Sequence, residues 1–132
     1  MTSIDKRLPK TTSYWKEGEI FFIKHTSFLI TTAENQAISE LIIQTMNDNS
    51  IKGLVINNRE ARGAWPKHVV DSALQEDSHQ SDLFKKKKIA TLTNSVSTTM
   101  QMNRVTKEIN MEEWAKAFNS EFNEEVKAFL LG

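Results

Sequence analysis

Cysteine is absent from this chain of 132 residues, and so is net charge. The lack of cysteine excludes disulfides, thiolate nucleophiles and cysteine-based metal sites. The 17 basic side chains are balanced by 17 acidic ones. A general nucleic-acid binder needs a basic excess to release counterions from the phosphate backbone, so the sequence predicts no nucleic-acid partner.

Long apolar runs and catalytic motifs are missing as well. No apolar stretch approaches the roughly 20 residues needed to span a bilayer, and the first residues lack the apolar core of a signal peptide, so we expect a cytoplasmic protein. The three histidines have no metal-ligand spacing such as His-x-x-x-His, and no Gly-x-Ser-x-Gly turn is present. We therefore expect no enzymatic activity, no metal and no cofactor.

The residues that are present predict a polar tail or arm over residues 1–12 and a single domain over residues 13–132. Aromatic and β-branched residues around Glu17 and Gly18 predict a hairpin over residues 13–23, with the glycine in the turn. The length is sufficient for one domain with a proper core.

A helix and the central strand follow. Thr31 and Glu34 form a capping-box pattern, and the helix that they open has an apolar stripe of Ala37, Ile38, Leu41, Ile42 and Met46. The unbroken apolar run over residues 53–56 predicts a strand buried on both faces. A polar loop over residues 57–66 leads to a second helix with Pro66 in its first turn. The apolar stripe of that helix is thin, so it is the best candidate for a mobile element.

The remaining residues predict two more strands, over residues 89–92 and 114–118, each followed by a helix. The first of these helices, up to Asn110, carries residues that we expect in the core: Val96, Met100, Met102, Val105 and Ile109. Ser120 is the expected N-cap of the terminal helix, which should bury Phe122, Val126, Phe129 and Leu130. The order β-β-α-β-α-β-α-β-α predicts an α/β fold with a mixed, mostly parallel sheet covered by helices.

This order resembles the STAS fold of anti-anti-sigma factors, and it looks most like the SpoIIAA-like group of small bacterial proteins over roughly residues 14–131. The resemblance is carried by Gly53-Leu54-Val55-Ile56-Asn57-Asn58-Arg59-Glu60-Ala61 before Gly63-Ala64-Trp65-Pro66, by Lys88-Ile89-Ala90-Thr91-Leu92 before Met100-Gln101-Met102, and by residues 118–130. It implies a non-enzymatic module that binds protein partners, in a branch linked to apolar ligands or membrane surfaces.

The candidate site surrounds the loop after the central strand, because ligands of open α/β sheets bind outside the carboxyl ends of the strands. Its residues are Asn58, Arg59, Arg62, Trp65, Val69, Ser95, Ser97, Thr98 and Met100. The two arginines could clamp an anion together with the helix start at Ser95. The simpler alternatives are a solvated arginine pair beside Glu60 and ordinary N-capping by the serine.

The expected occupant of this site is an apolar or amphiphilic small molecule, or a protein surface, held near the second helix. A homodimer is a further possibility that the sequence leaves open. The polybasic run Lys85, Lys86, Lys87 and Lys88 predicts at most weak peripheral contact with an anionic membrane, because four lysines alone are a weak anchor. The alternative function is an anti-anti-sigma-type partner-switching regulator that lacks the usual phosphoacceptor serine.

The alternative function leads to a prediction about phosphorylation. The resemblance implies a phosphorylatable serine at the start of the second helix, yet residues 57–66 contain no Ser, Thr or Tyr, and the next hydroxyl is Ser72. Ser72 lies about two turns into the expected helix. We therefore predict no phosphorylation between Asn57 and Leu74 in cells. Phosphopeptide mapping tests this, and substantial modification of Ser72 would revive the partner-switching function.

Overall fold

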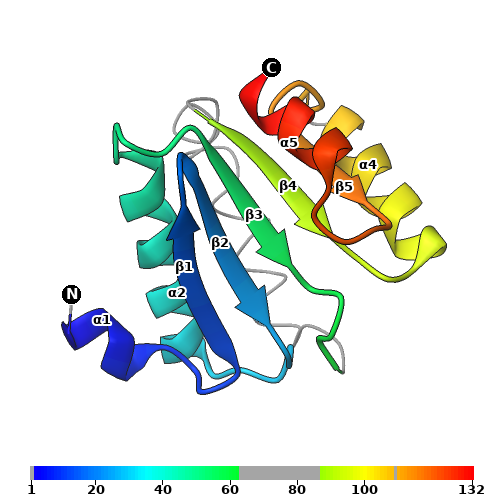
Figure 1. Ribbon diagram of the computed structural model, residues 1–132. Coiled ribbons are helices and arrows are strands. Elements are labelled where there is room, and N and C mark those ends of the chain that lie inside the picture. Colours follow the sequence, from blue (N-terminus) through cyan, green and yellow to red (C-terminus); the bar gives the residue numbers. More distant parts are fainter. Residues whose placement is uncertain (1, 63–86, 109) are drawn as a thin grey trace.

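The computed structural model describes residues 2–62, 87–108 and 110–132. The expected second helix lies outside the described residues, together with Trp65, Val69, Lys85, Lys86 and Ile109. Figure 1 shows the described elements in chain order: α1 (Thr2–Arg7), β1 (Thr12–Glu17), β2 (Ile20–His25), α2 (Thr32–Met46), β3 (Gly53–Asn57), β4 (Lys88–Leu92), α4 (Val96–Glu108), β5 (Ala115–Phe118) and α5 (Glu124–Leu131).

The five strands form one sheet in the order β1-β2-β3-β4-β5. The first pair, β1 and β2, is antiparallel, and the other three pairs are parallel. The hairpin turn is made at Gly18, whose φ of 59° lies in the region that favours glycine. The predicted α/β class with a mixed, mostly parallel sheet is therefore confirmed.

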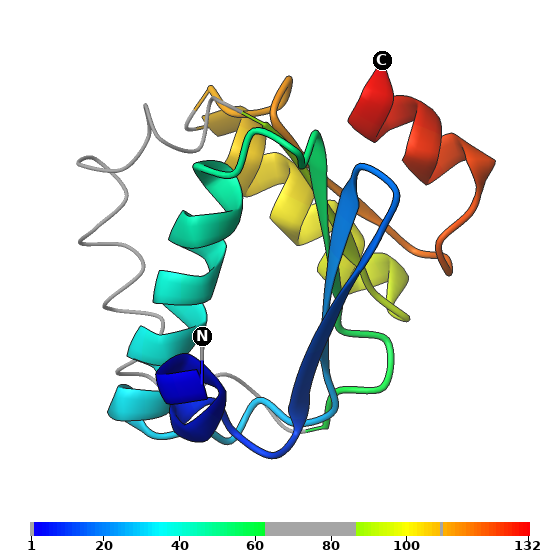
Figure 2. The ribbon, with the colours of Figure 1, turned by 60° about the vertical axis from the view of Figure 1, so that its left-hand side comes forward.

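Helices cover both faces of the sheet, with α2 and α4 on one side and α5 on the other (Figures 1 and 2). Because side chains alternate along a strand, the two faces form separate cores. The core under α5 contains Ile20, Phe22, Val55, Ala90, Leu92, Phe118, Val126 and Leu130. The core under α2 contains Ile4, Ile23, Ala37, Leu41, Met46 and Leu54.

The start of β3 depends on a glycine. A Cβ atom at Gly53 would lie 2.9 Å from Cβ of Leu130 on α5, which is closer than two such carbons can approach. The glycine therefore lets α5 lie directly on the sheet. On the other face, the predicted capping box of α2 is present: the Thr31 hydroxyl accepts from the Glu34 amide, and the Glu34 carboxylate accepts from the Thr31 amide.

The N-terminal segment, expected to be a polar tail or arm, contains the helix α1 in its first half. Ile4 is only 4% exposed, and it packs in the core under α2 with Leu8 at its margin. Two apolar side chains one helical turn apart are enough to dock a short helix. The domain core therefore begins before residue 13.

Three expectations about the later helices need correction, the first of which concerns Phe122: it precedes α5 and is 38% exposed rather than buried in the terminal helix. The helix α4 has no buried residue among those described, and Val96, Met100 and Val105 are exposed rather than core. The terminal helix is capped by Asn123, whose side chain accepts from the Val126 amide, and not by Ser120. Asn110 does follow the end of α4 with a φ of 60°, as a residue that stops a helix can.

None of the described helices is long and apolar enough to cross a membrane.

The end of β2 predicts a pH effect on stability. His25 is 3% exposed, its Nδ1 lies 2.9 Å from the Thr12 hydroxyl, and burial lowers its pKa from 6.5 to about 4. Between these pH values the unfolded chain binds more protons than the folded one, so stability falls as the pH falls through this window. The loss amounts to roughly 3 kcal/mol once the histidine is protonated in both states.

We predict that the free energy of unfolding of the wild type, measured with urea at pH 7, 5.5 and 4.5, shows this loss as the pH falls. In His25→Asn, the free energy of unfolding should no longer change with pH above pH 5. Carboxylates titrate mainly below that range and are unchanged in the variant, so the comparison isolates the histidine. Parallel pH profiles for the two proteins would contradict the assignment.

Candidate functional site

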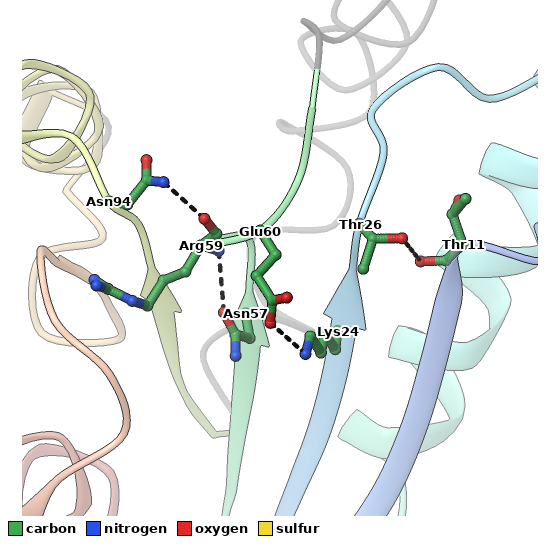
Figure 3. A network of polar contacts seen from close by, with 7 residues as sticks. All are labelled: Thr11, Lys24, Thr26, Asn57, Arg59, Glu60 and Asn94. Carbon is green, nitrogen blue, oxygen red and sulfur yellow. Dashed lines mark hydrogen bonds and ion pairs between the residues drawn. The ribbon is translucent and has the colours of Figure 1, made fainter.

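The loop over residues 57–62 follows the carboxyl end of β3 (Figure 3). The Asn57 carboxamide oxygen accepts from the Arg59 amide at 3.0 Å, and the Ala61 amide donates to the Asn58 carbonyl. Asn58 also donates its amide to the Leu92 carbonyl at the end of β4. These bonds hold the loop against the neighbouring strand instead of leaving it extended into solvent.

Arg59 links this loop to the segment between β4 and α4. Its Nη1 donates to the Thr93 carbonyl at 2.6 Å, and the Asn94 side chain donates to the Arg59 carbonyl at 2.7 Å (Figure 3). A bond from a charged donor is stronger than a neutral one. The two contacts run in opposite directions between the segments and fix the entry to α4.

Hydroxyl groups organise the first turn of α4. The Ser95 hydroxyl accepts from the Thr98 amide at 3.2 Å, as a capping serine does. Behind it, Oγ1 of the buried Thr93 lies 2.6 Å from Oγ1 of Thr99. Ser95 therefore has the capping role that was the simpler of its two predicted roles, while Ser97 and Thr98 are exposed.

Arg62 makes its contacts at the other neighbouring strand. Its amide donates to the Thr26 carbonyl at 3.2 Å, and its carbonyl accepts from the Phe28 amide at 3.0 Å. The described contacts thus join Arg59, but not Arg62, to the start of α4. Between them, Glu60 forms an ion pair of 2.5 Å with Lys24 on β2 (Figure 3), and this lysine lowers the pKa of the Glu60 carboxyl.

Asn58 contributes a buried acceptor to this edge of the sheet. Its carboxamide oxygen is shielded from solvent and has no hydrogen-bond partner in the described structure. A buried acceptor without a donor costs free energy, so such atoms are uncommon and are often satisfied by a bound group. Within the described part of the loop, the Asn58 side chain therefore has unused hydrogen-bonding capacity at a buried atom.

A pocket of about 600 Å³ lies along α4, and its described lining residues are Val96, Ser97, Met100, Gln101 and Arg104. Val96 is 63% exposed and Met100 is 67% exposed. Two of the predicted site residues, Ser97 and Met100, meet in this pocket. The sequence analysis did not assign the other three, Val96, Gln101 and Arg104, to the site. Val96 and Met100 are four positions apart on one helix, and this spacing was a usable signal that they share a face.

The lysine run has a structural role at its second half. Nζ of the buried Lys87 donates to the carbonyls of Thr45 and Asp48 at the end of α2. Lys88 donates to the Gly132 carbonyl at 3.2 Å and lies over the Phe129 ring. A cation at a helix C-terminus is favoured by the helix dipole. These two lysines hold the start of β4 to the end of α2 and to α5.

No group of three or more His, Asp or Glu side chains within residues 2–62, 87–108 and 110–132 is placed to hold a metal ion. No family model matches the chain, and no curated protein matches it. A solved structure of DspI from Pseudomonas aeruginosa is similar over 66% of this chain, with 10% identity and a TM-score of 0.41. The chain spans 38% of the length of that protein.

The Arg59 contacts lead to a prediction about stability. Replacing Arg59 by Ala removes the guanidinium bond to Thr93 and should lower the free energy of unfolding by about 2 kcal/mol. The matched control is Arg62→Ala, which should change it by less than about 0.5 kcal/mol because the described bonds of Arg62 are made by its backbone. Urea unfolding measures both.

The alternative role of Arg59 and Arg62 as an anion clamp gives a different result. In that case phosphate should raise the melting temperature of the wild type, and the double replacement by Ala should abolish this gain. Equal destabilisation by the two single replacements would contradict the structural role assigned to Arg59.

Proposed function

We propose that the chain is a STAS-like, non-enzymatic binding module that holds an apolar or amphiphilic small molecule against α4. The order of its described elements supports the STAS-like assignment, since a leading antiparallel hairpin is followed by parallel strands and helices. The observation that carries the binding function is the pocket along α4, in which Val96 and Met100 are exposed although they are apolar.

The dimensions and lining of this pocket support a small molecule as the occupant. Its volume of about 600 Å³ is within the usual range of small-molecule sites, which combine an apolar wall with a few polar groups. Val96 and Met100 provide the apolar wall, and the flexible thioether of methionine adapts to varied apolar shapes. Ser97, Gln101 and Arg104 add the polar groups that an amphiphile needs.

The position of α4 in the fold also supports the proposal. The helix begins four residues after β4 ends, at the carboxyl edge where α/β sheets bind their ligands. The contacts from Arg59 to Thr93 and from Asn94 to Arg59 fix the orientation of the first turn of the helix. A wall that is already held in place loses less conformational entropy on binding.

The test is a charge placed in the apolar wall. Met100→Glu puts a carboxylate against an apolar ligand, and we predict at least a tenfold loss of affinity for the neutral dye N-phenyl-1-naphthylamine, because burying an unpaired charge is costly. Fluorescence titration measures the dissociation constant. Native mass spectrometry of the purified protein should also show a small apolar molecule bound to the wild type.

The matched control is Val105→Glu, which places the same charge on an exposed residue of α4 (44% exposed) that is not among the described lining residues. It should leave dye binding nearly unchanged. Absence of binding by the wild type would remove the small-molecule function and leave a protein surface as the occupant. Equal losses in the two variants would place the site elsewhere.

A further inference from the structure

The backbone groups at the two outer edges of the sheet differ in their hydrogen-bond partners. At one edge, the Asn103 side chain on α4 accepts from the Ala117 amide at 2.8 Å and donates to the Ala117 carbonyl at 3.1 Å. The side chain therefore takes the place of a neighbouring strand along β5. At the other edge, β1 is the outermost strand and pairs only with β2 among the described strands (Figure 1).

The hydrogen-bond pattern identifies which groups of β1 point away from β2. Thr26 donates its amide to the carbonyl of the directly opposite Thr11 at 2.9 Å, so these two residues form a hydrogen-bonded pair. Such pairs alternate along antiparallel strands, which directs the backbone groups of residues 12, 14 and 16 outward. Thr12 donates to the Pro9 carbonyl, and the outward amides and carbonyls of Tyr14 and Lys16 remain for a partner.

We propose that this edge binds the same edge of a second copy of the chain, as an antiparallel β1–β1 pair about a two-fold axis at Trp15. This register places Tyr14 opposite Lys16 of the partner subunit. The outward backbone amides and carbonyls of both residues then form hydrogen bonds across the interface. A two-fold axis at residue 16 would place two lysines directly opposite each other, which is unfavourable. An axis at residue 14 would require the Thr12 amide, which already bonds to Pro9.

The side chains agree with this register on the face covered by α5. Trp15 is 39% exposed, and its indole lies parallel to the Phe22 ring at 5.3 Å between centroids. In the proposed pair it meets Trp15 of the partner subunit at a non-hydrogen-bonded position, where opposite side chains are closest. Aromatic pairs at such positions stabilise antiparallel strands. An indole already held by Phe22 loses little freedom when it is buried.

Charge complementarity supports the register on the other face. The Tyr14 hydroxyl donates to the Asp5 carboxylate on α1, so a negative charge lies beside Tyr14. The opposite residue in the pair is Lys16 of the partner subunit, whose Nζ donates to the Ser50 hydroxyl within a single chain at 2.8 Å and would turn to this carboxylate in the dimer. The two-fold axis repeats the contact, and each dimer gains two such pairs. The occupant of this edge is therefore another copy of the chain and not an unrelated strand.

Disulfide trapping tests the register, and the absence of cysteine from the chain gives a clean background. Trp15→Cys should form an intermolecular disulfide on mild oxidation, because non-hydrogen-bonded partners have Cα atoms about 4.5 Å apart, within reach of a disulfide. Ser13→Cys should not, since residue 13 faces residue 17 of the other copy. A mixture of Ser13→Cys and Glu17→Cys proteins should cross-link. Crosslinking of Ser13→Cys alone as fast as Trp15→Cys would overturn the register.

Analytical ultracentrifugation of the unmodified chain provides the second measurement, with an expected mass of twice 15.1 kDa. Lys16→Glu should weaken the dimer about tenfold through two repulsive contacts with Asp5. Adding Asp5→Lys should restore it. The control Lys107→Glu makes the same charge change on an exposed residue of α4 and should have no effect. The proposal would be overturned if the unmodified chain were a monomer at all concentrations, or if Lys16→Glu and Lys107→Glu weakened the dimer equally.

Discussion

The fold depends on the burial of β3 on both of its faces. Leu54 and Val55 point to opposite sides of the sheet, and neither is exposed to solvent. Each belongs to a different core, one under α2 and the other under α5. Because side chains alternate, a shift of one residue in the pairing of β3 would exchange the two cores and expose apolar surface. The register of the whole parallel sheet is therefore determined by this strand.

The fixed strand in turn positions the loop that follows it. Asn57 is still paired within the sheet, opposite Lys24 and Leu92, and the loop over residues 58–62 follows directly. Contacts then extend to both neighbours, through Arg59 to the start of α4 and through Glu60 to β2. A loop with bonds on both sides is a rigid connection between secondary-structure elements. Its role at this edge is to hold α4 in place as much as to touch a ligand.

The sequence was sufficient to predict features that depend on local pattern, and insufficient for those that depend on what lies nearby in space. The strands, the hairpin turn and the capping box of α2 follow from neighbouring residues, and all are present. The apolar spacing along α4 is the same whether the helix faces a core or a pocket, so the exposure of Met100 could not be predicted. The contact of Lys87 with the end of α2 joins residues 42 positions apart, and no local pattern encodes it.

The two proposed binding surfaces lie on different parts of the sheet, which has a consequence for how they interact. The edge of β1 is at one end of the strand order, whereas α4 packs on β5 at the other. Pairing two copies through β1 would leave both α4 pockets at the outer ends of one continuous sheet. Coupling between two binding sites requires a structural element with two arrangements, whose equilibrium is shifted by binding at either site. The strands between them are buried and held in a single register, so they offer no such element, and we expect the two surfaces to bind independently.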